Sequence, residues 1–374
     1  MVRAASFGVP ALALLNGLLG ATRAMGTMTP QVTINQIFKP LAQIGLLLPI
    51  MLVAETPNPT LVGLAWSTPI LVAALATLGS VVKLGGLSRT GEHVVSSSEF
   101  WNYTTPRAAS VGLQTMLERF DVILIGALSS TAIAGVYGTL TRYIAAGNYL
   151  VFSVAQAISP TLRRAIAKQN WEKAQSILYR ASSWMVLVTW PYFVFLAVKA
   201  TGFLGLFANL ETDGSTTLII LAIGMTINGF VGPVDLTLLM LGRSRRALGT
   251  TFFALATNVA LGVVLIPKFG LEGAAIAWVA ASVLQNFTNA FFVNQKSGLR
   301  PFGKEAVTAA VGAVLCFGIP GLLVGGQSFF GLILAGALGV GLYLFWCIKF
   351  ADQLGISQWV DKALSIAGRG GASS

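Results

Sequence analysis

Two acidic and two basic side chains interrupt the apolar sequence between residues 108 and 160. Glu118, Arg119 and Asp121 lie in one apolar segment, and Arg142 lies in the next. A guanidinium group keeps its charge when partly desolvated and binds phosphate through paired hydrogen bonds. A carboxylate inside a membrane can take up a proton or Na⁺. The pattern predicts that Arg142 and Arg119 bind an anionic group, and that Glu118 and Asp121 are candidates for a coupling ion.

The same four residues are also compatible with a purely structural role. The turn between the two segments lies near residues 129–130, so Arg119 and Arg142 stand at nearly the same level of a helical hairpin. Glu118 and Asp121 are three residues apart and share a helix face, from which Arg119 points away. Ion pairs among the four side chains would neutralise their charges and hold the two helices together.

Two more charged residues in apolar segments are candidates. Lys39 binds an anionic group or, because it is close to the inner end of its segment, extends its side chain to the membrane surface. Asp235, beside Pro233, is a further coupling-ion candidate, unless it pairs with Arg243 or Arg245. Five asparagines are predicted to form hydrogen bonds between helices rather than to bind substrate: Asn148, Asn228, Asn258, Asn286 and Asn289.

The sequence offers little for metal or covalent chemistry. His93 is the only histidine, and the two cysteines, Cys316 and Cys347, are separated. An ordinary zinc site cannot be built from these residues. The short loops contain only Glu211 and Asp213 as closely spaced carboxylates. We therefore expect no metal, no cofactor and no catalytic residue, and we consider a membrane enzyme the least favoured class.

The composition places these residues in a membrane protein. Of the 374 residues, 55% are hydrophobic and only 10% are charged, with a mean hydropathy of +0.76. A soluble domain needs a more polar surface. The formal charge of +11 comes from short clusters of Lys and Arg between apolar runs, not from one continuous basic face. This arrangement favours membrane lipids, and not nucleic acid, as partners.

Helices of bilayer length account for nearly the whole chain. A span needs about 20 apolar residues to cross a hydrocarbon core about 30 Å thick. We predict an all-α, polytopic membrane helix bundle of about 11 transmembrane helices. The expected spans are residues 6–22, 32–54, 60–82, 106–128, 131–160, 181–200, 216–241, 247–266, 271–294, 305–324 and 329–349.

Lys and Arg gather in alternate loops, which predicts the orientation of the chain. The main clusters fall at residues 163–180, 243–246 and 296–304, and basic residues recur after the last span. The positive-inside rule places this side in the cytoplasm. Residues 163–180 and the tail 350–374 also mix apolar with charged residues, which predicts amphipathic helices on the inner leaflet; the alternative is an ordinary solvated linker.

Short sequence similarities indicate an internal repeat. The matching pairs are NGLLG (16–20) with NGFVG (228–232), LLLP (46–49) with VVLIP (263–267), and LVGLAW (61–66) with LEGAAIAW (271–278). Because they recur in the same order, the first three spans and the three spans of residues 216–294 are expected to be equivalent parts of two parallel repeats. The spans of residues 106–200 have no counterparts before residue 6, so three helices are expected to be missing from the first lobe.

This repeat suggests a division of the chain into two lobes. We expect a partial N-lobe at residues 1–82 and a cytoplasmic linker at 83–105. A C-lobe follows at 106–294, then an additional helix pair at 305–349 and a cytoplasmic amphipathic tail at 350–374.

A series of motifs carries a family resemblance. The motifs are DVILIGALSS (121–130), AGVY (134–137) followed by Arg142, ISP (158–160) before a basic stretch, LGR (241–243) and LIPKFGLEGAA (265–275). In this order and spacing they resemble the second lobe of the polysaccharide flippases. These flippases belong to the multidrug, oligosaccharidyl-lipid and polysaccharide exporter superfamily, and this chain would lack the first three of their helices.

The resemblance implies a function. Such proteins have two pseudo-symmetric lobes around a central cavity and work by alternating access. The implied substrate is a lipid-linked oligosaccharide or polyprenyl-phosphate-linked intermediate of cell-surface polysaccharide biosynthesis, flipped across the bacterial cytoplasmic membrane with H⁺ or Na⁺ coupling. Arg142, Arg119 and Lys39 would bind its anionic headgroup. The alternative is a multidrug/cation antiporter of the same superfamily.

Overall fold

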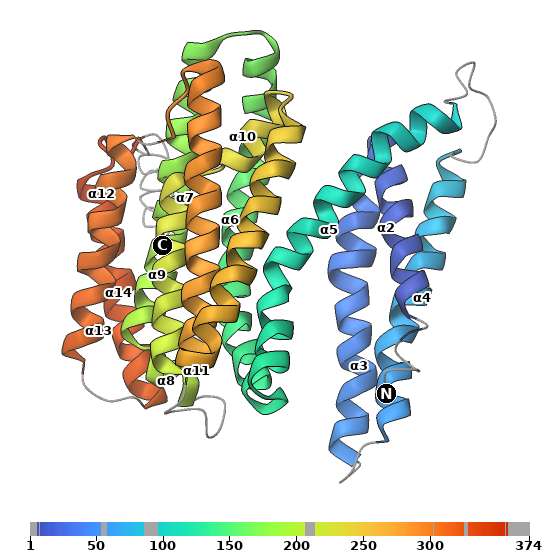
Figure 1. Cartoon of the computed structure of the whole chain (residues 1–374), viewed down its shortest axis with the longest axis horizontal. Coiled ribbons are helices and arrows are strands. Elements are labelled where there is room, and N and C mark those ends of the chain that lie inside the picture. Colours follow the sequence, from blue (N-terminus) through green and yellow to red (C-terminus); the bar gives the residue numbers. More distant parts are fainter. Residues whose placement is uncertain are drawn as a thin grey trace, which may run out of the picture. The chain divides into compact units, whose positions relative to one another are not determined.

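The computed structural model describes residues 6, 8–53, 58–85, 96–205, 214–301, 303–324, 328–355 and 357. These residues form helices, turns and short connections, and contain no strand (Figure 1). The predicted all-α fold is confirmed. The chain forms two compact units, Met1–Ser97 and Ser98–Ser374, which are described separately below.

The first unit is a small helical bundle. It contains α2 (Gly8–Ala24), the π-helix η1 (Gln31–Phe38) that continues into α3 (Lys39–Val53), and α4 (Pro59–Lys83). Apolar side chains of α2 and α4 pack together, including Leu15, Leu19 and Ile70. The side-chain amide of Gln43 donates to the carbonyl group of Trp66 at 3.0 Å and so links α3 to α4.

The second unit is larger and is organised around α7 (Trp171–Val198), which contacts α6, α9 and α12 (Figure 1). Its other elements are α5 (Ser97–Leu128), α6 (Thr131–Ala167), α8 (Ala200–Gly205), α9 (Ser215–Val231), α10 (Val234–Met240), α11 (Ser244–Ser297), α12 (Lys304–Ala313), the π-helix η2 (Val314–Gly318), α13 (Ile319–Leu323) and α14 (Phe329–Lys349).

All the predicted spans fall on helical segments. Within the described residues, seven segments are long and apolar enough to cross a membrane. One of these, Ser244–Ser297, contains two predicted spans, because its helical path is broken at Gly270 (φ 54, ψ −125). A Cβ atom on Gly273 would clash with the carbonyl group of Leu265, so glycine is required where the two halves meet. The other predicted spans correspond to α2, which has 17 residues, and to the less apolar α5 and α6.

The prediction of a separate amphipathic helix at residues 163–180 is wrong. Instead, α6 extends to Ala167 and α7 begins at Trp171. Gln169 has a positive φ of 54°, which ends the first helix, and the side chain of Asn170 accepts from the backbone N–H of Lys173 at 3.0 Å. The apolar residues of this stretch therefore belong to two long helices. Of the tail, residues 350–355 and 357 are described, and the rest lies outside the described residues.

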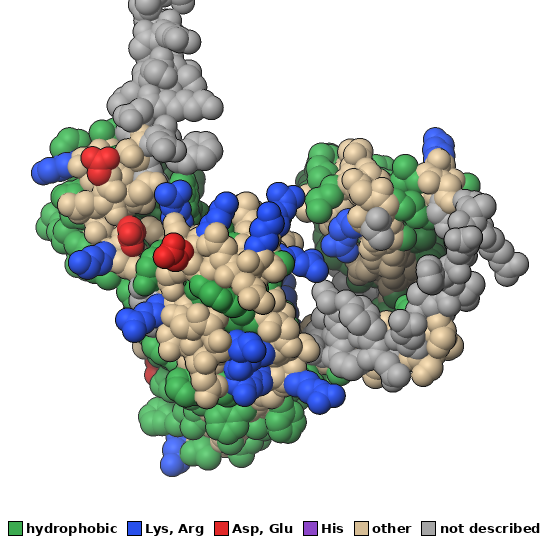
Figure 2. Space-filling view, turned by 90° about the horizontal axis from the view of Figure 1, so that it is seen from above, with side chains coloured by type: hydrophobic (Ala, Val, Ile, Leu, Met, Phe, Trp, Pro, Cys, Tyr) green, Lys and Arg blue, Asp and Glu red, His purple; other side chains and the backbone are tan. Residues whose placement is uncertain are grey.

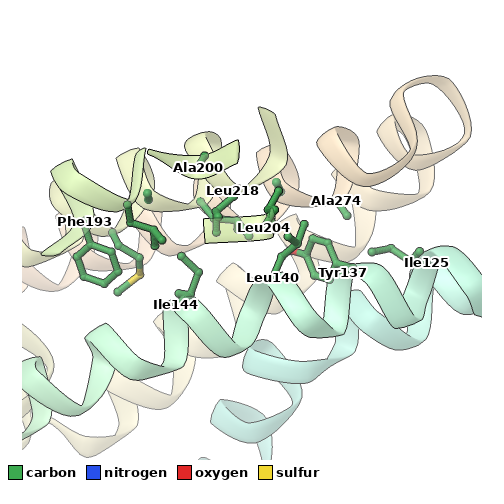
Figure 3. Packing of buried hydrophobic residues seen from close by; sticks show 14 of the residues in the cluster. Ile125, Tyr137, Leu140, Ile144, Phe193, Ala200, Leu204, Leu218 and Ala274 are labelled. Atoms are coloured by element: carbon green, nitrogen blue, oxygen red, sulfur yellow. The ribbon is translucent and has the colours of Figure 1, made fainter. Parts of the chain in front are cut away.

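The core of the second unit is an apolar cluster between α6 and its neighbours (Figure 3). Tyr137, Leu140 and Ile144 point from α6 toward the residues of α8 and α9, among them Leu204 and Leu218 (Figure 3). Close approach of helices depends on small residues, as is usual in membranes. A Cβ atom on Gly147 would clash with Phe193 of α7, and one on Gly224 would clash with Val279 of α11.

Candidate functional site

The loops that connect α6 to α7, α10 to α11 and α11 to α12 emerge at one end of the second unit. The end of α6, the start of α7, α10 and the end of α11 are joined by a cluster that includes Leu162, Leu178, Leu238 and Val293. Lys and Arg gather at this end, with few acids among them (Figure 2). The basic residues of these loops and adjoining helix turns are Arg163, Arg164, Lys168, Lys173, Arg180, Arg243, Arg245, Arg246, Lys296, Arg300 and Lys304. We call this the basic end of the unit.

The two candidate arginines are exposed. Arg119 lies on α5 and Arg142 on α6. Neither forms an ion pair with a carboxylate in the part of the chain that the structure describes. The side chain of Glu118 lies outside the described residues. Mutual neutralisation is therefore not observed for Arg142, whose guanidinium group remains accessible.

Asp121 lies against a residue that the sequence did not single out as a site residue. Its carboxylate is 3% exposed, accepts from the backbone N–H of Val122 at 2.9 Å, and faces the hydroxyl of Tyr137 on α6. The Tyr137 hydroxyl is buried and has no partner in hydrogen-bond geometry among the described residues. Asp121 and Tyr137 are nearly equidistant from the turn at residues 129–130, so the depth count applied to Arg119 and Arg142 would have found this pair.

Asp235 occupies the broken part of a predicted span. The span at residues 216–241 is divided into α9 and α10 at Gly232 (φ 78) and Pro233. Asp235 follows this break, and its carboxylate accepts a hydrogen bond from the side chain of Asn289 on α11. The proposed pairing of Asp235 with Arg243 or Arg245 is not found, because Asn289 supplies the donor.

This carboxylate belongs to a network that ties three helical segments together. Asn289 is only 1% exposed, and its side-chain oxygen accepts from the Thr250 hydroxyl at 2.8 Å. Asp235 as a whole residue is exposed, while its carboxyl group is surrounded by protein atoms. A carboxylate that is fixed by a buried amide inside a membrane protein is suited to bind a cation or a proton.

Other polar residues also join helices, as predicted. Asn286 of α11 donates to Asn228 of α9 at 2.9 Å, and Gln285 donates to Thr251 at 2.9 Å between the two halves of α11. The interhelical role is thus confirmed for Asn228, Asn286 and Asn289. This role stays a prediction for Asn258, which is buried, and for Asn148, which is exposed.

Lys39 belongs to the first unit. Its ammonium group donates to the side-chain oxygen of Asn35, one helical turn away, at 2.7 Å, and the residue is half-buried. Its role in binding an anionic group stays a prediction. Among the described residues no three His, Cys, Asp or Glu side chains are grouped as metal ligands would be, and His93 lies outside the described residues.

The helices and polar groups define a multi-pass membrane protein whose interior combines an apolar core with interhelical polar networks. The same fold occurs in a solved structure titled "Lipid II flippase MurJ, inward closed conformation". The TM-score is 0.71 at 13% sequence identity, and the match covers 92% of this chain and 72% of that chain. At this identity the likeness shows the fold alone.

Comparisons of the sequence with known proteins indicate which membrane proteins this chain is similar to. The family model described as MatE matches residues 106–264, from α5 into the first half of α11. A curated relative, "Probable low-salt glycan biosynthesis flippase Agl15" from Haloferax volcanii, is 26% identical over 228 residues. That alignment covers 60% of this chain and 48% of the relative, so the chain spans about half the length of this relative. Together these matches confirm the resemblance to polysaccharide flippases that the motifs predicted.

Proposed function

We propose that this chain flips a lipid-linked oligosaccharide, or a related polyprenyl-phosphate-linked intermediate, across a bacterial cytoplasmic membrane for cell-surface polysaccharide biosynthesis. The main support is that a MatE region at residues 106–264 and a curated glycan flippase relative coincide with a flippase fold. The protein acts as a transporter and not as an enzyme, and it works by alternating access.

Arg142 is the proposed contact for the anionic headgroup. Its guanidinium group is exposed and has no carboxylate partner among the described residues. A free guanidinium group binds a phosphate through two parallel hydrogen bonds. Arg119 is the second proposed contact, and Lys39 of the first unit is the third. The lipid tail of the substrate stays in the bilayer while the headgroup and sugar pass.

Asp235 is the leading candidate for coupling to H⁺ or Na⁺. The break at Gly232 and Pro233 is a place where a helix can bend, and discontinuous helices are common at ion and substrate sites of transporters. An ion bound at Asp235 would change the bond to Asn289 and so act on the packing of α10 against α11. Asp121, beside Tyr137, is the second candidate, and Glu118 remains a candidate from the sequence.

The second candidate function is a multidrug/cation antiporter. It is favoured by the carboxylates of Asp121 and Asp235, which would attract an organic cation. The exposed charges of Arg119 and Arg142 act against it, because they repel such a substrate.

Transport by the purified protein distinguishes the two functions. In proteoliposomes, the flippase proposal expects movement of a fluorescent lipid-linked saccharide between leaflets, with no uptake of an organic cation such as ethidium. Ethidium uptake driven by a Na⁺ or H⁺ gradient, without lipid movement, would instead establish the antiporter.

A further inference from the structure

A groove runs between α6 and α7 and opens toward the basic end. Its volume is about 430 Å³. The wall from α6 is mainly apolar and includes Ala157 and Ile158, and the wall from α7 includes Ile177 and Trp184. The groove is formed entirely by the second unit and contains none of the candidate transport residues.

The sequence spacing explains the shape of the groove. On α7, Lys173, Ile177, Arg180 and Trp184 follow one another at intervals of four, three and four residues, which places them on one face of the helix. Lys173 and Trp184 are eleven residues apart, a distance of about 16 Å along the helix axis at 1.5 Å per residue. The predicted span on α7 begins at residue 181, and the one on α6 ends at residue 160. The groove therefore runs from the headgroup region, where Lys173 lies, into the inner end of these two spans.

The charged residues of the groove are cationic. Lys173 lies at its open end, and Arg180 lies deeper, between Ile177 and Trp184 in the sequence. Lys173 and Arg180 line it, and both are exposed. Glu172, the nearest acid in sequence, lines a different depression on another side of α7 together with Glu305 and Asp352, and Arg180 borders both. Long basic side chains extend along an apolar wall and present their charge at the membrane surface. The groove thus combines apolar walls at the inner end of two predicted spans with two cations whose long side chains reach toward the headgroups.

We propose that this groove binds an anionic phospholipid of the leaflet at the basic end. One acyl chain lies along Ala157, Ile158 and Ile177 as far as Trp184, and the phosphate contacts Lys173 and Arg180. The two cations and the apolar walls on both helices suit the phosphate and the upper acyl region of an anionic phospholipid. The lipid is a partner distinct from the transported substrate, so the proposal stands independently of the proposed function.

Quenching of Trp184 by brominated lipids tests the proposal in the full chain. Brominated phosphatidylglycerol and brominated phosphatidylcholine are compared in mixed micelles, and the signal of Trp184 is the difference between the unaltered protein and a Trp184→Phe variant. Phosphatidylglycerol is expected to quench Trp184 at a lower mole fraction. Lys173→Gln with Arg180→Gln should lower its apparent affinity by roughly tenfold to thirtyfold, the effect of removing two cations beside an anionic lipid.

Matched variants make the result specific. Lys296→Gln with Lys304→Gln removes the same charge from the same end outside the groove and should leave quenching unchanged. Lys173→Arg with Arg180→Lys should retain the preference, and Ala157→Phe, which fills the apolar wall, should weaken quenching by both lipids. Equal effects of the two double Gln variants would overturn the proposal. So would displacement of phosphatidylglycerol by polyprenyl phosphate at lower concentration, because the groove would then serve the longer chain.

Discussion

Asn289 is the residue whose replacement tests the polar network most sharply. Its side chain donates to Asp235 of α10 and accepts from Thr250 in the first half of α11. Asn289→Leu keeps the branched shape and the number of side-chain heavy atoms but removes both bonds. The carbonyl group of Ala247 lies 2.9 Å from the Thr250 hydroxyl and accepts its proton once Asn289 is replaced, so the hydroxyl keeps a partner. The principal loss is the donor to the Asp235 carboxylate.

The expected loss of stability follows from the kind of bond. A hydrogen bond to a charged group contributes about 1.5–3 kcal/mol. Interhelical bonds in a membrane protein average about 0.6 kcal/mol and reach about 1.7 kcal/mol. Because Asp235 is partly exposed, we expect Asn289→Leu to lower the free energy of unfolding by about 2 kcal/mol. Asn286→Leu, which removes only a neutral bond to Asn228, should cost about 0.6 kcal/mol.

Denaturant unfolding in detergent–lipid micelles measures these differences. A double-mutant cycle with Asp235→Leu then isolates the pair, and the cost of Asn289→Leu should fall by at least about 1 kcal/mol once Asp235 is gone. If Asn289→Leu costs no more than Asn286→Leu, and its cost is the same in both backgrounds, the bond between Asn289 and Asp235 does not stabilise the helices.

Three further substitutions give expected outcomes. Arg142→Gln should reduce the flipping rate by about tenfold or more, because a bidentate phosphate contact is lost. Arg245→Gln at the basic end should leave the flipping rate unchanged. Equal flipping rates for the two variants would show that Arg142 does not bind the headgroup. Tyr137→Phe removes a hydroxyl without a partner, so the free energy of unfolding should stay within about 1 kcal/mol of the unaltered protein; a larger drop would show that the hydroxyl is bonded. Gly224→Ala should lower the free energy of unfolding by about 1–3 kcal/mol, because the added Cβ atom clashes with a valine of α11. Gly249→Ala, where the added Cβ atom meets open space, should not lower it. Equal changes in melting temperature for the two variants would contradict this packing.

The positions of the helices could be predicted from the sequence because length and hydropathy are local properties. A run such as residues 329–349 crosses an apolar core or leaves its backbone polar groups unsatisfied in lipid, and α14 has these bounds. The stretch at residues 163–180 misled the prediction for a related reason. Its apolar and basic residues repeat with helical spacing, but the turn at Gln169 and Asn170 divides it between two helices.

The contacts between helices were harder to predict. The partner of Asp235 depends on how α10 and α11 are rotated about their axes. This rotation is set by side-chain packing in the folded protein and cannot be derived from the apolar sequence of each helix alone. Arg243 and Arg245 are near Asp235 in sequence, whereas Asn289 is 54 residues away and reaches it through the fold. Tyr137 was overlooked because an apolar-looking AGVY motif does not show that its hydroxyl faces a carboxylate.

Movement of the proposed substrate between leaflets tests the central claim most directly. Proteoliposomes are loaded with a short-chain fluorescent lipid-linked saccharide in both leaflets, and a membrane-impermeant quencher is added outside. The proposed function predicts that vesicles containing the protein lose the fluorescence of both leaflets at a rate that rises with protein content. Loss of only the outer-leaflet signal, as in protein-free vesicles, would contradict it.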